Sequence, residues 1–265
     1  TITKLGVEFY EPRMVNGKNI ASLTEEETAE LLAIMENYGI YASSIGSPIG
    51  KIDIETGDFA AHLENLKKMI EFAHILEAKN LRAFSFFIPK GKDPADYKNE
   101  VMDRIGKMLD VMRGSGVTFC HENEKGIYGD LASRCAELHR AFPQLKAVFD
   151  PANFVQCAQE TLSAWEMLAP HIKYMHIKDA LPNGRVVPAG QGHGNVQALL
   201  KKYAAQGGKV LSLEPHLTKF VGLQNLEAEQ VSEVGALHFE NTDLAFDYAA
   251  IFVLVLIDIW YLSEK

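Results

Sequence analysis

Short apolar runs alternate with longer amphipathic segments along the chain, and this alternation restricts the possible folds more than any other feature. Each run is long enough to form one buried strand. The runs lie at residues 7–10, 40–45, 81–87, 117–122, 146–150, 174–178 and 210–214. Because helical patterns separate them at intervals of about 30 to 40 residues, we predict a parallel α/β architecture.

Two parallel architectures fit this pattern, a closed barrel and an open doubly wound sheet. No G-x-G-x-x-G follows the first strand and no G-x-x-x-x-G-K-[ST] occurs, so the usual nucleotide-binding signatures of open sheets are missing. Polar residues at the ends of several successive strands also suit the mouth of a barrel. We therefore expect a TIM-type (β/α) barrel that occupies residues 1–265 as a single domain, a size that such barrels commonly reach.

Capping residues indicate where the helices begin. Thr24 and Glu27 are spaced as a capping box, and Gly39 is placed to end that helix. Asp58 is a predicted N-cap, and Asp93 followed by proline predicts the start of another helix. Further helical patterns cover residues 131–142, 162–168 and 196–203.

The apolar segment 249–262 is predicted to be a buried terminal element rather than a membrane span. Asp258 interrupts it, and it is shorter than the roughly 20 residues needed to cross a bilayer. Its spacing fits a helix, while its β-branched residues also permit a strand. No signal peptide is visible at the start of the chain, and the three cysteines have no C-x-x-C spacing, so we expect reduced thiols and a cytoplasmic location.

Four residues at the ends of successive predicted strands form a candidate metal site: Glu122, Asp150, His176 and Glu214. In a barrel the carboxyl ends of parallel strands converge on one mouth, which would bring these side chains together. Three carboxylates and one imidazole suit Mn²⁺, Mg²⁺, Co²⁺ or Zn²⁺. Without a cation the carboxylates repel one another, so we expect raised carboxylate pKa values in the metal-free protein.

Several sequence strings together resemble the sugar-phosphate isomerase/epimerase family, the xylose-isomerase-like TIM barrels. The resemblance runs from about residue 5 to about residue 218 and is most specific in HENEKGIYGD and FDPANFVQC. The other strings are SSIGSPIGKI, FSFFIP, HIKDA, VPAGQGHG and LSLEPH. In that family a divalent metal is held by Glu, Asp, His and Glu, which match the four residues already selected.

The resemblance implies proton transfer next to a carbonyl group in a sugar or a related keto-polyol. A divalent ion polarises the carbonyl, and carboxylates at the mouth move the proton. Glu122 and Glu214 are the candidate acid and base, each also a ligand; the alternative is that both only bind the metal. Epimerisation, aldose–ketose isomerisation and dehydration of inososes share this first step, so the choice among them stays open.

Other polar residues near the same strand ends are candidates for binding the substrate. Lys125 and Lys178 could bind a phosphate or a carboxylate, although surface lysines are usually only solvated. Glu124 and Asn153 could bind sugar hydroxyls, and several epimerases of the family have histidine in place of Asn153. The remaining candidates, as direct or indirect contacts of the substrate, are His193 and His216.

Two other functional classes remain open. An abasic-site-type metal endonuclease shares the barrel superfamily, but the formal net charge of −9 argues against a nucleic-acid-binding surface. A non-catalytic metal- or sugar-binding barrel is the second alternative. The resemblance begins after the family's first βα unit. Three readings are open: the barrel lacks that unit, the C-terminal apolar run takes its place, or the resemblance misleads about the number of strands. A barrel that lacks one strand has unpaired edges, which would favour a homo-oligomer.

Overall fold

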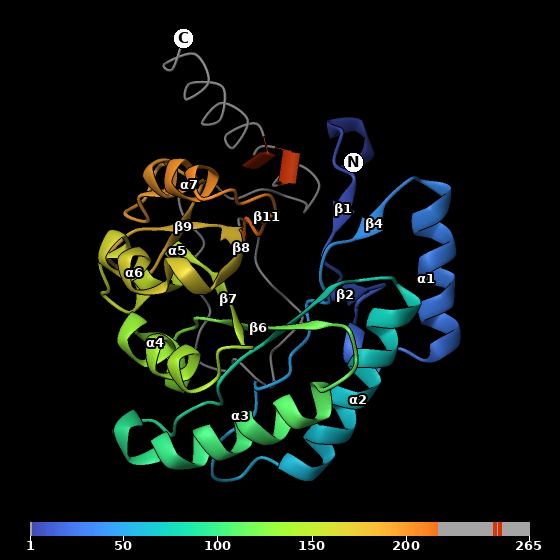
Figure 1. Cartoon of the computed structure of the whole chain (residues 1–265). Helices are drawn as coiled ribbons and strands as arrows, with labels where there is room; N and C mark the ends of the chain where they lie inside the picture. Colours follow the sequence, from blue (N-terminus) through green and yellow to red (C-terminus); the bar gives the residue numbers. More distant parts are fainter. Residues whose placement is uncertain (1, 217–245, 248, 251–265) are drawn as a thin grey trace. The chain divides into compact units, whose positions relative to one another are not determined.

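All seven apolar runs contain a strand in the computed structural model, which describes residues 2–216, 246–247 and 249–250 (Figure 1). Strands β5, β6 and β7 are neighbours in one sheet, and strands β8 and β11 pair with each other. The chain divides into two compact units, one ending at Val148 and the other beginning at Phe149. The units are described separately below, and the single domain stays a prediction.

The strands of the first unit pair in parallel. β5 (Asn80–Ala83) pairs with β6 (Thr118–Glu122), and β6 pairs with β7 (Lys146–Phe149). β1 (Phe9–Tyr10) pairs in parallel with β4 (Tyr41–Ala42). A short antiparallel hairpin and four 3-10 segments complete the unit: β2 (Met14–Val15), β3 (Lys18–Asn19), η1 (Ile2–Leu5), η2 (Ile20–Ser22), η3 (Pro94–Tyr97) and η4 (Tyr128–Asp130). The parallel strands confirm the predicted architecture.

Four helices connect these strands: α1 (Glu25–Asn37), α2 (Phe59–Ile75), α3 (Lys98–Met112) and α4 (Ala132–Ala141). The capping box is confirmed, because Thr24 Oγ1 accepts the N–H of Glu27 while Glu27 Oε2 accepts the N–H of Thr24. Gly39 follows α1 in the left-handed region that ends helices, with φ of 63°. The carboxylate of Asp58 caps α2 by accepting the N–H of Ala61.

The predicted helix start at Asp93 is correct in place but wrong in type. Asp93 caps the 3-10 segment η3, and the α-helix α3 begins only at Lys98. Two hydrogen bonds stabilise the first turn of η3. The Asp93 carboxylate accepts the N–H of Ala95, and the backbone carbonyl of Asp93 accepts the N–H of Asp96. The i→i+3 spacing of the second bond is that of a 3-10 turn.

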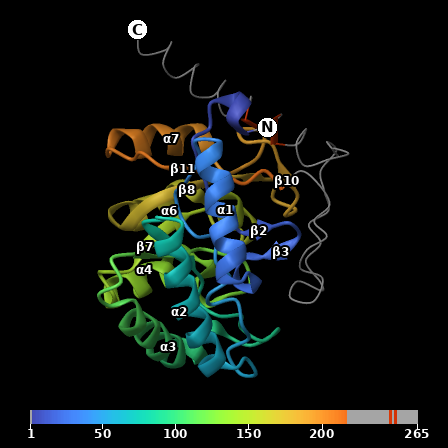
Figure 2. The same ribbon diagram turned by 90° about the vertical axis from the view of Figure 1, so that its right-hand side faces the viewer.

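Helices α1, α2 and α3 pack in chain order (Figure 2). Helix α2 also contacts β5. Their buried faces follow the helical period: Leu66, Met69, Phe72 and Ala73 of α2 are fully buried. Each such side chain stabilises the fold by about 1.5–3 kcal/mol when fully removed from water, alanine by less. The apolar pattern of the sequence therefore predicts the buried side of these helices correctly.

Between Phe149 and His216 the second unit has these helices and strands: α5 (Pro151–Gln156), α6 (Thr161–Leu168), α7 (Val196–Ala205), β8 (Ile172–Ile177), β9 (Asp179–Ala180), β10 (Val186–Val187) and β11 (Leu211–Leu213), with the 3-10 segment η5 (Ala169–His171). β11 pairs in parallel with β8, with Ser212 opposite His176. The antiparallel hairpin of β9 and β10 and the short helix α5 were not predicted from the sequence.

The predicted terminal element at 249–262 lies almost entirely outside the described residues. Of this segment, Ala249 and Ala250 are described, and both are buried. Among the residues that the structure describes, no helix has the length and apolar character needed to cross a membrane.

One buried histidine of the first unit makes fold stability depend on pH. His62 Nε2 accepts the N–H of Gly50 at 2.6 Å, so it must be unprotonated in the folded state. Burial, with a smaller effect of nearby Arg104, lowers the pKa of His62 from 6.5 to about 4. The unfolded chain therefore takes up the proton first, so this stabilisation is complete above pH 6.5 and is lost as the pH falls toward 4.

We expect the free energy of unfolding to fall by about 2–3 kcal/mol between pH 7 and pH 4.5 because of His62, at 1.36 kcal/mol per pKa unit. Urea unfolding across this range measures it. His62→Gln should reduce the fall in the free energy of unfolding between pH 7 and pH 4.5 by that amount. His74→Gln, on the exposed side of α2, should leave this fall unchanged. Equal slopes in the parent and His62→Gln would contradict the assignment.

Candidate metal site

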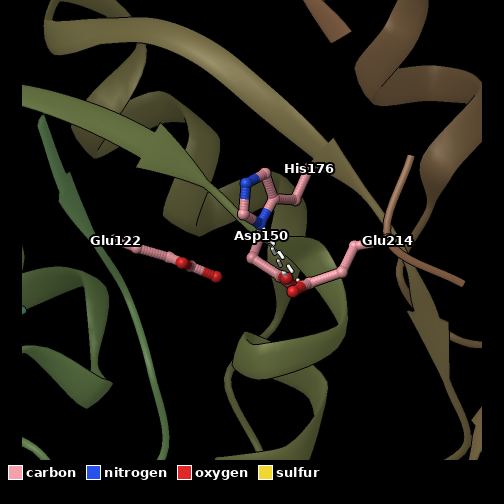
Figure 3. A group of neighbouring side chains, drawn as sticks. All are labelled: Glu122, Asp150, His176 and Glu214. Atoms are coloured by element: carbon pink, nitrogen blue, oxygen red, sulfur yellow. Dashed lines mark ion pairs between the residues drawn. The ribbon is translucent and has the colours of Figure 1, made fainter. Parts of the chain in front are cut away.

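Four side chains gather at the ends of strands β6, β7, β8 and β11. One potential ligand atom from each of Glu122, Asp150, His176 and Glu214 lies within 4.8 Å of the others (Figure 3). The first three side chains are buried and Glu214 is half-buried. Asp150, His176 and Glu214 belong to the second unit and Glu122 to the first, so the assignment of all four to one metal site stays a proposal.

Asp150 directly follows β7 and serves two purposes. Its Oδ1 accepts the N–H of Asn153 at 2.9 Å and so caps helix α5. Its Oδ2 lies 2.8 Å from Lys178 Nζ and 3.8 Å from His176 Nδ1. Because one oxygen is held by the helix start, the other is aimed at the cluster.

His176 and Lys178 are two residues apart at the end of β8, so their side chains project to the same face. Lys178 is buried, and its ammonium group lies 2.8 Å from Asp150 Oδ2 and 3.1 Å from Glu214 Oε2. A buried ammonium is tolerated only when such partners compensate for its lost hydration. Lys178 therefore acts as a cation between two of the candidate ligands.

Glu214 follows β11 and is surrounded by positively charged or hydrogen-bonding groups. Its Oε2 is 3.4 Å from His176 Nδ1, and its Oε1 is 3.2 Å from His216 Nε2. Burial alone would raise the pKa of Glu214, but Lys178, His216 and His176 hold it well below its usual range. The expectation of raised carboxylate pKa values was therefore wrong for Glu214, because it omitted the cation that Lys178 supplies.

Glu122 ends strand β6, where its neighbour in the first unit is Arg82 of β5. Arg82 Nη1 lies 3.2 Å from Glu122 Oε2, and Arg82 Nε lies 3.9 Å from Glu11 Oε1. Arg82 is buried, and sequence analysis did not identify it. A signal was present, since an arginine inside the apolar run 81–87 must find a partner when buried.

The other residues predicted to bind the substrate differ in their burial and in their ion pairs. Glu124 pairs with Lys51 at 2.8 Å, and Lys51 Nζ lies 4.4 Å from the centre of the Phe84 ring. Lys51 was not predicted as a site residue. Asn153 is buried, whereas Lys125 and His193 are exposed. The roles of these residues in binding stay predictions.

Comparison with known proteins places these features in a family context. A family model described as xylose isomerase-like TIM barrel matches residues 2–240. The uncharacterized protein YihM of Escherichia coli is 29% identical over 156 residues, which cover 56% of this chain and 45% of YihM. The aligned segment thus spans less than half of that relative.

Solved structures show the same fold at low sequence identity. A D-tagatose 3-epimerase-like protein is 13% identical with a TM-score of 0.75, covering 97% of this chain and 91% of its own. A xylose isomerase-like TIM-barrel protein from Mycobacterium smegmatis, in complex with magnesium, is 15% identical with a TM-score of 0.66, covering 81% and 79%. At these identities the likeness concerns the fold alone.

The position of Lys178 leads to a prediction about metal affinity. Its ammonium group contacts oxygens of Asp150 and Glu214 and would repel a divalent ion at the same atoms. We expect Lys178→Met to bind Mn²⁺ about tenfold more tightly than the parent, a difference of about 1.4 kcal/mol. Isothermal titration at pH 7 measures it.

Lys202→Met is a suitable control for this variant. Lys202 lies in the same unit but at an exposed position of α7, where it pairs with Glu166 at 2.7 Å. Its replacement should leave Mn²⁺ affinity unchanged. Equal or weaker binding by Lys178→Met would show that Lys178 does not compete with the ion.

Proposed function

The chain belongs to the xylose isomerase-like TIM-barrel family, and we propose that it is a divalent-metal-dependent isomerase or epimerase. The reaction would be proton transfer next to the carbonyl group of a sugar or a related keto-polyol. The observation that carries this proposal is the cluster of three carboxylates and one imidazole. Family membership alone would not suffice, because one fold can host many activities.

The donor set fits a divalent metal ion. Carboxylate oxygens and an imidazole nitrogen suit Mn²⁺, Mg²⁺, Co²⁺ and Zn²⁺, and the described residues place no thiolate in the cluster. Glu122, Asp150, His176 and Glu214 would hold the ion, which when bound would polarise the substrate carbonyl. The magnesium complex of the Mycobacterium smegmatis protein supports a hard divalent ion.

Glu122 and Glu214 are the proposed proton-transfer pair, each also a ligand. The low pKa of Glu214 keeps its carboxylate ionised at neutral pH, so Oε1 or Oε2 can accept a proton. Arg82 orients Glu122 by contacting its Oε2. Lys178 would bind an oxygen of the substrate, since its ammonium group already reaches two groups of the site.

The remaining predicted contacts would shape the binding of a sugar or polyol. Buried Asn153 and half-buried Glu124 offer hydrogen-bonding groups for hydroxyls. His216 would act through its contact with Glu214 Oε1. Lys125 and His193 are exposed and would contact a substrate that extends outward. A homo-oligomer and a cytoplasmic location also belong to this proposal.

The alternatives have less support. An abasic-site-type endonuclease would need a surface for DNA, and the formal net charge of −9 opposes one. A non-catalytic metal- or sugar-binding barrel would need the same cluster and differs only in lacking turnover. Cleavage of an abasic duplex by the Mn²⁺-loaded protein would favour the first, and binding without turnover would favour the second.

The metal hypothesis makes a prediction that needs no substrate. A ligand that binds only the folded state stabilises it by RT ln(1 + [L]/Kd), which is about 2.7 kcal/mol at 100 Kd. Mn²⁺ should therefore raise the melting temperature of the parent by several degrees in calorimetry. His176→Ala should lose most of this shift while its metal-free fold survives, and an unchanged shift would remove His176 from the ligand set.

The catalytic hypothesis predicts proton exchange with solvent. The Mn²⁺-loaded protein should exchange the hydrogen next to the carbonyl of one member of a panel of ketoses, inososes and hydroxy-keto acids in D₂O, observed by NMR. Glu214→Gln should retain Mn²⁺ but lower exchange at least about 100-fold, the usual effect of an acid or base. Glu166→Gln, an exposed control on α6, should match the parent. Undiminished exchange by Glu214→Gln would exclude Glu214.

A further inference from the structure

A buried carboxylate lies directly beside the candidate site, and the metal hypothesis does not use it. Asp179 follows Lys178 in the sequence and has no exposed surface. In the second unit it belongs to β9, where it is opposite Val187 of β10. Its surroundings therefore require a separate explanation.

Four backbone N–H groups converge on the Asp179 carboxylate. Oδ1 accepts the N–H of Ala180 and of Gly194, both at 2.8 Å. Oδ2 accepts the N–H of Gly190 and of Gly192, both at 2.9 Å. Three of the four donors belong to residues 188–194, which we call the glycine loop.

The glycines permit the loop to approach Asp179 closely. A Cβ at Gly192 would overlap Asp179 Oδ1, and one at Gly194 would lie 2.7 Å from the same oxygen. Neither distance is possible for a real side chain without a shift of the loop or the carboxylate. The motif GQGHG is thus explained by its contact with Asp179 rather than by flexibility.

The far end of the glycine loop lies against the start of helix α5. A Cβ at Gly194 would lie 3.2 Å from Pro151 Cβ, and Gly194 O accepts the hydroxyl of Thr161 at 3.1 Å. Pro151 directly follows Asp150 in the sequence. The loop is therefore fixed by residues that directly follow two members of the site, Lys178 and Asp150.

We propose that Asp179 is a positioning residue that holds the glycine loop against α5 and thereby keeps Asp150 and Lys178 buried. Hydrogen bonds to a charged acceptor are roughly twice as strong as neutral ones, so a carboxylate with four donors is a firm attachment. Its effect on metal binding rests on the proposed function, whereas its effect on burial does not.

Two variants test the attachment from its two sides. Asp179→Asn keeps the shape but turns an amide NH₂ toward two N–H donors, so it should release part of the loop. Gly192→Ala introduces the overlapping Cβ and keeps the carboxylate. The control is Asp53→Asn, because Asp53 Oδ1 accepts the N–H groups of Glu55 and Thr56 in a loop of the other unit.

Amide hydrogen exchange and acetylation of Lys178 by acetic anhydride measure burial without any metal. Both Asp179→Asn and Gly192→Ala should speed exchange of residues 188–194 at least about tenfold and Lys178 acetylation about fivefold, as expected for local opening. Exposed Lys202 serves as the internal reference for labelling. Unchanged exchange or labelling in both variants, at an unchanged rate for Lys202, would overturn the proposal.

Titration with Mn²⁺ alone measures the effect on the site. Asp179→Asn should weaken Mn²⁺ binding about tenfold, as loss of outer supporting groups typically does, while Asp53→Asn should not. An open loop with unchanged Mn²⁺ affinity would overturn the positioning role. If the parent itself binds no Mn²⁺, the proposed function fails, and exchange and labelling still decide whether Asp179 holds the loop.

Discussion

The burial of charge at the end of strand β8 is the constraint on which the candidate site depends. Asp150 has no exposed surface and Lys178 has little, and each would cost several kcal/mol to bury alone. Their 2.8 Å contact offsets this cost, and Glu214 shares the same ammonium group. The site is therefore organised around the ammonium group of Lys178. A divalent ion would have to bind carboxylates of Asp150 and Glu214 that already contact this cation.

Two short segments of the chain, FDPANF and HIKDA, position most of the charged groups of the candidate site. In FDPANF a buried strand ends, Asp150 supplies a carboxylate, and the same carboxylate caps the helix whose first residue is a proline. In HIKDA, alternate residues serve different purposes: His176 and Lys178 face the cluster, while Asp179 holds the glycine loop. Strand periodicity of two is what separates these roles.

Much of the fold was predictable from the sequence because local signals agreed with tertiary structure. The seven strand runs and the caps at Thr24 and Asp58 depend on periodicity and short-range hydrogen bonds. The four candidate ligands were found because each lies at, or directly next to, the end of a strand. Arg82 and Lys51 were missed because a partner distant in sequence defines each, and the low pKa of Glu214 was missed because Lys178 was treated as a substrate contact.

The two proposed proton-transfer carboxylates differ in the cations beside them. Glu122 faces Arg82, whose guanidinium is always charged and held by a second contact to Glu11. Glu214 Oε2 lies 3.1 Å from the ammonium group of Lys178 and Glu214 Oε1 lies 3.2 Å from His216 Nε2, and these neighbours hold the pKa of Glu214 well below its usual range. Each of the two carboxylates therefore has a positively charged side chain of its own unit beside it, Arg82 for Glu122 and Lys178 for Glu214. In the proposed reaction the two carboxylates remain a proton-transfer pair, with Arg82 orienting Glu122 and Lys178 contacting Glu214.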